Sequence, residues 1–319
     1  MVKVWDVHMQ DRLKSPVLVF DVGGSHVSAA VCLDSDFRLG PVASDRHSAP
    51  ETSEAFVDLL HTLGVKAAAG LPPVTGATLA MPSPFHYETG VCLMRHKLPY
   101  LYGVNLRQAL ARRFAWAPAQ VDFLNDANAY LLGEVGAGAG RGFARVVALT
   151  LGTGTGAAFA VDGQLVTDGP GVPPGGEIWD LPYEGGIVED FLSSRAISSG
   201  YQRRTGNTST PAALAECAPA DPAAQETFTE FGQHLGCVLS TRLAAFSPDV
   251  VVLGGGISRA ARLFLPAAER QLTGGLAPQL RVSELQDLAP LVGCGVARFL
   301  SGNDASPTLG TRSAQANPV

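Results

Sequence analysis

The chain repeats one pattern about 130 residues apart: an apolar strand, a glycine-rich turn and a returning apolar strand. The first copy reads VLVFDVGGSHVSAAVCLD and the second VVALTLGTGTGAAFAVDG. Each copy predicts a β-hairpin whose corner uses the conformational freedom of glycine. Two copies of one design predict two related α/β lobes, and 319 residues suffice for two domains that share a cleft.

Apolar periodicity places further elements between the glycine corners. Helices are predicted over 51–63, 105–114, 187–205, 221–246 and 290–300. Strands are predicted over 75–82, 120–124 and 250–258. The expected organisation is a small lobe of residues 1–124 plus about 290–300, a large lobe of residues 125–289, and a disordered polar tail at 301–319.

Composition excludes several classes of protein. A net charge of −6 gives no electrostatic footprint for nucleic acid. No apolar run reaches the 18 residues of a membrane span. The five cysteines never lie closer than 20 positions, which argues against a disulfide framework and a CxxC metal site. A cytoplasmic protein without membrane or nucleic-acid partners is therefore expected.

Two common nucleotide motifs are absent. The chain has four lysines, and none follows a glycine, so there is no GxxxxGK[ST] phosphate loop. Gly152, Gly154 and Ala157 fit GxGxxA after a strand. That motif must open a helix, whereas the residues here continue as a strand, so a dinucleotide site is rejected.

Three glycine-rich corners remain, each directly after a predicted strand. Glycine lets backbone amides approach an anion closely. One such corner alone is more typical of an ordinary turn, but three, two of them in matching positions, indicate a polyphosphate clamp that needs no lysine. The candidate nucleotide-side residues are Asp21, Gly23, Gly24, Ser25, Gly152, Thr153, Gly154, Gly254, Gly255 and Gly256.

Acidic residues supply the candidate chemistry. Asn125 and Asp126 open a predicted helix, where such residues serve as caps. Alternatively, Asp126 could accept the proton of a hydroxyl that attacks phosphorus, with Asn125 holding a neighbouring hydroxyl. Glu177, Asp180 and Glu189 form either a solvated acidic loop, a weak metal site or acceptors for sugar hydroxyls.

These motifs resemble the ROK sugar kinases of the actin-like ATPase superfamily. DVGGSHVSAAV and LTLGTGTGAAFAVDGQL are similar to the two phosphate motifs, and VVVLGGGIS to the adenosine motif. MPSPFHYETGV resembles the sugar-side loop, with Ser83 in place of glycine. FLNDANAYLLGE is the most specific match, and the resemblance covers about residues 16–300.

The resemblance implies two actin-like (ribonuclease-H-like) lobes with a central cleft. It also implies transfer of phosphate from ATP with Mg²⁺ to a hexose, with glucose O6 as the expected acceptor. Asp126 would be the general base, and Asp21 would organise the hydrated Mg²⁺ without direct ligation. The implied sugar-binding residues are Ser83, Asn125, Glu177, Asp180 and Glu189.

Three departures from the family concern the sugar side. Asp180 stands where the family has a zinc-binding histidine, and the following loop has no cysteine, so no structural zinc is predicted. Trp179, Leu181 and Tyr183 are then expected to anchor that loop by packing. Lys97 stands where an asparagine is frequent. Because an ionised Asp180 only accepts hydrogen bonds, unmodified hexoses are expected to be preferred over N-acetylhexosamines.

Two alternatives stay open at this stage. Phosphate loops of this kind serve ATP or polyphosphate as donor. A non-catalytic sugar sensor is also compatible with the altered loop, although the family's repressors carry an N-terminal DNA-binding domain and only about 16 residues precede the first strand here. Hexose and nucleotide are the expected partners, and a homodimer is compatible with the sequence.

Overall fold

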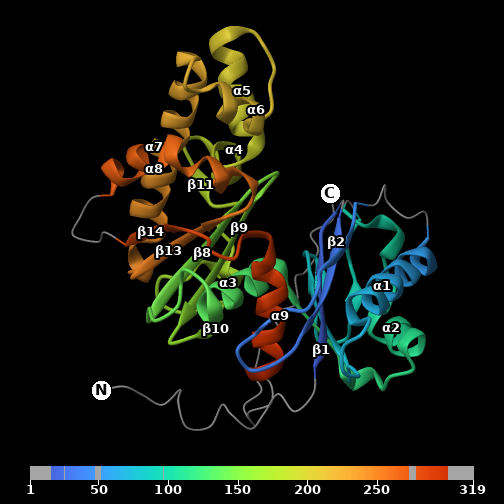
Figure 1. Ribbon diagram of the computed structural model, residues 1–319. Coiled ribbons are helices and arrows are strands. Elements are labelled where there is room, and N and C mark those ends of the chain that lie inside the picture. The colour runs from blue at the N-terminus through green and yellow to red at the C-terminus, as the bar shows by residue number, and fades with distance from the viewer. Residues whose placement is uncertain (1–15, 25, 47–51, 96, 273–277, 301–319) are drawn as a thin grey trace.

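A computed structural model describes residues 16–24, 26–46, 52–95, 97–272 and 278–300 (Figure 1). Ser25 and the predicted tail 301–319 lie outside the described residues. The strands form two five-stranded sheets, ordered β3-β2-β1-β4-β7 and β10-β9-β8-β13-β14. The α/β class and the two lobes expected from the sequence are confirmed.

The two sheets share one topology, as the repeated pattern predicts. In the small lobe β1 (Val17–Val22) pairs antiparallel with β2 (Val27–Cys32) and parallel with β4 (Ala77–Met81). In the large lobe β8 (Arg145–Leu151) pairs antiparallel with β9 (Thr155–Val161) and parallel with β13 (Val250–Gly254). The outer strands are β3 (Ala43–Asp45), β7 (Val121–Asn125), β10 (Gln164–Val166) and β14 (Gln279–Val282).

Each sheet is covered on both faces. The outer face of the small sheet packs on α1 (Ser53–Ala68) and α2 (Leu106–Phe114) (Figure 1). The far face of the large sheet packs on a helical layer that shares one apolar core with β8, β9 and β13. That layer consists of α4 (Val188–Phe191), α5 (Ser194–Thr205), α6 (Pro211–Cys217), α7 (Pro222–Arg242) and α8 (Ala261–Gln271).

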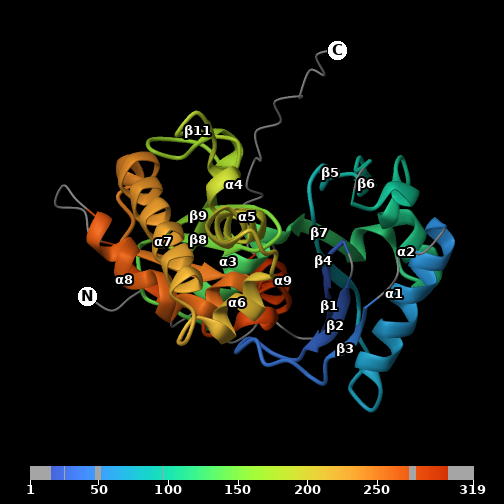
Figure 2. The same cartoon turned by 90° about the horizontal axis from the view of Figure 1, so that it is seen from above.

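Two helices lie between the sheets (Figure 2). α3 (Asp126–Ala137) packs on the large sheet, while α9 (Ala289–Leu300) packs on α3 and on β1, β2 and β4. The two helices cross at glycines that allow close contact. A Cβ on Gly133 would overlap the Ala289 carbonyl, and a Cβ on Gly293 would overlap the Ala129 carbonyl. α9 therefore contacts both lobes, and its assignment to the small lobe stays a prediction.

Some predicted boundaries were wrong for local reasons. The single helix over 187–205 is two, because Ser193 caps α5 by accepting a hydrogen bond from Ala196 N. Strand β13 ends at Gly254, since Gly255 has a φ of 77°. No helix among the described residues is both long and apolar enough to cross a bilayer.

Candidate active site

Three parallel strands bring four of the predicted site residues to one edge of the small-lobe sheet. β1, β4 and β7 run in the same direction, with Asp21 opposite Ala80 and Met81 opposite Asn125. Side chains at or just beyond the carboxyl ends of such strands meet. Asp21, Ser83, Asn125 and Asp126 consequently gather, although they are spread over 105 positions of the sequence.

Asn125 both caps α3 and organises the neighbouring loop. Its Oδ1 accepts hydrogen bonds from Ala127 N at 3.0 Å and Asn128 N at 3.2 Å. Its Nδ2 donates to Ser83 Oγ at 3.2 Å and to the Tyr87 hydroxyl at 3.3 Å. Tyr87 in turn donates to Met81 O at 3.0 Å. This network fixes the side chains next to Asp126 that are predicted to bind sugar.

Asp126 is the first residue of α3 rather than its cap. The carboxylate is half-buried and accepts one hydrogen bond, from Ala127 N at 2.9 Å. Burial raises the pKa of Asp126, while the charge of Lys97 and the Ala127 N–H oppose the rise and the nearby Asp21 adds to it. A partly desolvated carboxylate at a helix N-terminus is a suitable proton acceptor.

The first glycine corner has two basic neighbours. His26 Nε2 lies 3.3 Å from Asp21 Oδ2, and this contact raises the pKa of His26. A Cβ on Gly23 would overlap the His26 ring, and one on Gly24 would lie 3.9 Å from Lys97 Cβ. Two basic residues therefore lie next to the corner that is predicted to approach phosphate.

The second and third glycine corners touch, because β8 and β13 are parallel neighbours. A Cβ on Gly255 would overlap the backbone of Leu151, which explains why glycine is needed there. In contrast, a Cβ on Gly152 or Gly256 would meet no atom within 4 Å. These two glycines leave backbone open beside the corners, as a phosphate or adenosine group requires.

The second corner is joined to the acidic loop by Glu189. Glu189 Oε2 accepts a hydrogen bond from Thr155 N at 2.9 Å. The Thr155 hydroxyl donates to Leu192 O at 2.7 Å, and Ser194 N donates to Gly152 O at 2.7 Å. One carboxylate oxygen of Glu189, Oε2, is therefore bonded to the second glycine corner. The other oxygen, Oε1, is the one left for the predicted hydrogen bond to sugar.

The remaining acidic residues differ in their environment. Glu177 accepts a hydrogen bond from Trp179 Nε1 at 2.8 Å, and its charge acts on the Tyr87 hydroxyl of the other lobe. Asp180 is exposed, and the described residues give it no hydrogen bond. Trp179 is 40% exposed, so its expected role as a packing anchor is wrong, whereas Tyr183 at 7% is buried as expected.

The residues fit the expected nucleotide and metal. Mg²⁺ in kinases is held by one or two carboxylates together with waters and phosphates. Asp21 offers Oδ1 for this purpose beside the first glycine corner, with Oδ2 facing His26. Among the described residues, no group of three His, Cys, Asp or Glu side chains could hold a metal by itself.

Sequence reasoning missed two site residues. Tyr87 lies in the loop that resembles the sugar-side motif, and it became visible only through its bonds to Asn125 and Ser83. His26 follows a glycine corner, where nothing in the sequence signals its contact with Asp21. Lys97 was singled out by its position alone, and the structure places its charge near Asp126.

Comparison with known proteins agrees with this geometry. The profile of the ROK family matches residues 17–294. A glucokinase of Thermotoga maritima is 28% identical over 81% of this chain and 87% of that protein. The N-acetylgalactosamine kinase AgaK of Shewanella is 26% identical over 83% and 90%. The ROK hexokinase of Thermus thermophilus superposes with a TM-score of 0.75 at 26% identity, covering 91% of this chain and all of that one. The chain therefore belongs to the ROK family and is similar to the sugar kinases in it.

Proposed function

We propose that the protein is a sugar kinase that transfers a phosphoryl group from ATP to a hydroxyl of a hexose, with glucose O6 as acceptor. The observation that carries the proposal is the position of Asp126. It is half-buried, follows the capped start of α3 and lies near both Asp21 and Lys97. This position supports a role for Asp126 as proton acceptor, between the hydrogen-bond network of Asn125, Ser83 and Tyr87 that would hold the sugar and the glycine corner that would approach phosphate.

The reaction needs a base, a held acceptor and compensation of phosphate charge. Asp126 accepts the proton of the attacking hydroxyl while the new O–P bond forms and the bond to the leaving phosphate breaks. Asn125 and Ser83 hold an adjacent hydroxyl. Magnesium, when bound, supplies charge compensation at the phosphates, and Asp21 positions its water shell.

The donor side of the proposal rests on the open backbone. Gly152 and Gly256 would let phosphate and nucleoside approach the main chain. Lys97, whose Cβ lies near Gly24, adds positive charge on the donor side. The sugar side rests on acceptors: Glu177 and the free oxygen of Glu189 accept hydrogen bonds from sugar hydroxyls and cannot donate to an N-acetyl carbonyl.

A panel of sugars and donors tests the proposal. Phosphorylation of glucose, mannose, N-acetylglucosamine and N-acetylmannosamine is measured by a coupled assay, once with ATP and once with polyphosphate. We expect kcat/KM to be highest for glucose with ATP. A preference for polyphosphate would show that ATP is not the main donor. A preference for an N-acetyl sugar would overturn the assignment of glucose as acceptor.

The same panel separates a kinase from a sensor. A protein that binds glucose in a calorimeter but transfers no phosphate from either donor would be a sugar-binding protein. That result would overturn the role of Asp126 as a base.

A further inference from the structure

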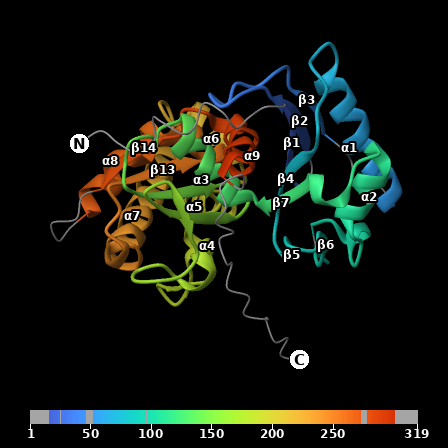
Figure 3. The same cartoon turned by 90° about the horizontal axis from the view of Figure 1, so that it is seen from below.

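The chain between Glu177 and Glu189 forms a small hairpin that connects the two acidic residues. β11 (Pro182–Tyr183) pairs antiparallel with β12 (Gly186–Ile187). The ladder continues outward, because Val188 N donates to Leu181 O and Glu189 N to Trp179 O, both at 3.0 Å. Whatever holds this hairpin therefore helps to set the position of the Glu189 backbone, while Thr155 N holds one oxygen of its carboxylate. Figure 3 shows β5 (Phe85–His86) of the small lobe and α4 of the large lobe on the same side of the molecule.

Helix α7 holds the hairpin at two places. The Tyr183 hydroxyl lies 2.9 Å from His234 Nδ1, and Arg242 donates to Pro182 O. Burial lowers the pKa of His234, so its neutral ring keeps a lone pair with which to accept the hydroxyl hydrogen. The charges that act on His234 are those of Glu230 on the same helix, Glu184 in the turn of the hairpin and Arg203 on α5.

Aromatic contacts join the same anchor to α4. The Tyr183 ring meets Phe191 edge-on at 5.0 Å, and Phe191 lies 4.8 Å from the His234 ring. Phe191 is the last residue of α4, which contains Glu189. The three rings therefore connect α7 to the element that carries a predicted sugar-binding carboxylate.

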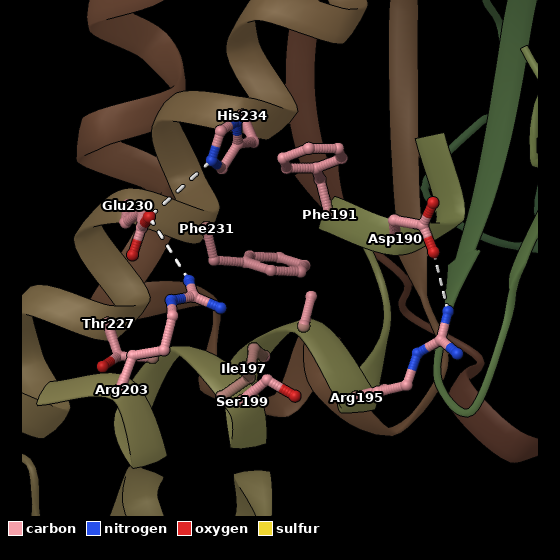
Figure 4. A pocket seen from close by; sticks show the side chains of 11 residues that line it. Asp190, Phe191, Arg195, Ile197, Ser199, Arg203, Thr227, Glu230, Phe231 and His234 are labelled. Atoms are coloured by element: carbon pink, nitrogen blue, oxygen red, sulfur yellow. Dashed lines mark hydrogen bonds and ion pairs between the residues drawn. The ribbon is translucent and has the colours of Figure 1, made fainter. Parts of the chain in front are cut away.

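A cavity of about 270 Å³ lies behind this cluster (Figure 4). Phe191 and His234 line it together with Ile197, Phe231 and Arg203. None of its lining residues belongs to the candidate active site. Atoms that border empty space lack packing partners on that side. The orientation of Phe191 and His234 consequently depends on Tyr183 more than it would in a filled core.

We propose that Tyr183 and His234 are positioning residues for sugar binding, which fix the hairpin so that Glu189 and Glu177 meet the acceptor hydroxyls. This inference rests on the proposed function, since it assigns those carboxylates to the sugar. The alternative is a purely structural cluster, whose loss would lower stability and leave the sugar site unchanged.

Four variants separate these roles. Tyr183→Phe removes the hydroxyl and keeps the ring, and His234→Ala removes its partner. His234→Asn returns an acceptor near the position of Nδ1, so it serves as the rescue. Gln233→Ala changes the exposed neighbour on the same helix and is the matched control.

The readouts are KM for sugar, KM for ATP, kcat, Tm and the sugar dissociation constant by calorimetry. Loss of one ordinary buried hydrogen bond corresponds to about 2- to 12-fold in an equilibrium. We expect Tyr183→Phe and His234→Ala to raise KM and Kd for glucose by that factor, with KM for ATP unchanged. His234→Asn and Gln233→Ala are expected to stay near the wild type.

The outcomes distinguish this inference from the proposed function. An equal rise in both KM values, or a lower Tm with unchanged sugar affinity, would overturn the positioning role. If the wild type bound glucose without phosphorylating it, the kinase proposal would fail while the calorimetric constants still decided the positioning role. Absence of any sugar binding would overturn both.

Discussion

Replacing Asp126 by asparagine should abolish most of the activity and leave the fold intact. A positioned general base contributes roughly 10²- to 10⁴-fold to a rate. At about 1.36 kcal/mol for each factor of ten, the barrier should rise by about 2.7–5.4 kcal/mol. The loss should fall on kcat, because the amide keeps the size and shape of the carboxylate.

The structure explains why Asp126→Asn should lose activity without losing stability. Ala127 N already has a second acceptor in Asn125 Oδ1, at 3.0 Å against 2.9 Å for Asp126. An amide also avoids the desolvation that raises the pKa of the acid. The free energy of unfolding of Asp126→Asn is therefore expected within about 0.5 kcal/mol of the wild type.

The neighbouring residue provides the matched comparison. Asn125→Ala removes the true cap of α3, which should cost about 0.5–2 kcal/mol of unfolding free energy. Single-turnover kinetics and chemical denaturation of both variants check the pair. A near wild-type rate for Asp126→Asn, or a loss of stability equal to that of Asn125→Ala, would refute the assignment of the base.

Three further results are expected. Lys97→Met should move the acidic limb of the pH–kcat/KM profile to higher pH, because Asp126 works only when ionised and loses a charge that lowers its pKa; an unchanged limb would contradict this. Gly255→Ala should lower Tm clearly, since a Cβ there would overlap Leu151 in a backbone with positive φ, whereas Gly256→Ala has open space and should keep Tm while raising KM for ATP. Elemental analysis of the purified protein should show no bound zinc, because Asp180 and the loop after it, which has no cysteine or histidine, do not supply the nitrogen and sulfur ligands of such a site.

Local patterns predicted much of the fold. The repeat of strand, glycine turn and strand predicted both hairpins. Both pair antiparallel, because strands with the same apolar pattern bury corresponding faces. Asn105 and Asp221 were readable as caps from their type and position, and the structure has them as caps of α2 and α7. Such signals depend only on residues that are close in sequence, so they can be recognised without the structure.

Specific side-chain contacts were not predictable in this way. The contact of His26 with Asp21, five positions away, and that of His234 with Tyr183, on another element, join side chains whose types also occur on ordinary surfaces. Glu134 is another example: it is fully buried, and its carboxylate accepts from Ala139 N, Leu285 N and the Ser283 hydroxyl. Only the folded arrangement shows that this acid holds α3 to the chain before α9.

The glycine crossing of α3 and α9 has a mechanical consequence. β7 runs into α3 without a loop, since Asn125 ends the strand and caps the helix. Asp126 consequently lies where the small-lobe sheet joins the first helix that packs on the large-lobe sheet. If the lobes turned about this junction, Gly152 and its neighbours would move relative to the small-lobe sheet, while Asp126 would stay near Ser83. Asp126 and the bound sugar would then keep their relative positions, and only the phosphate donor would have to move toward them.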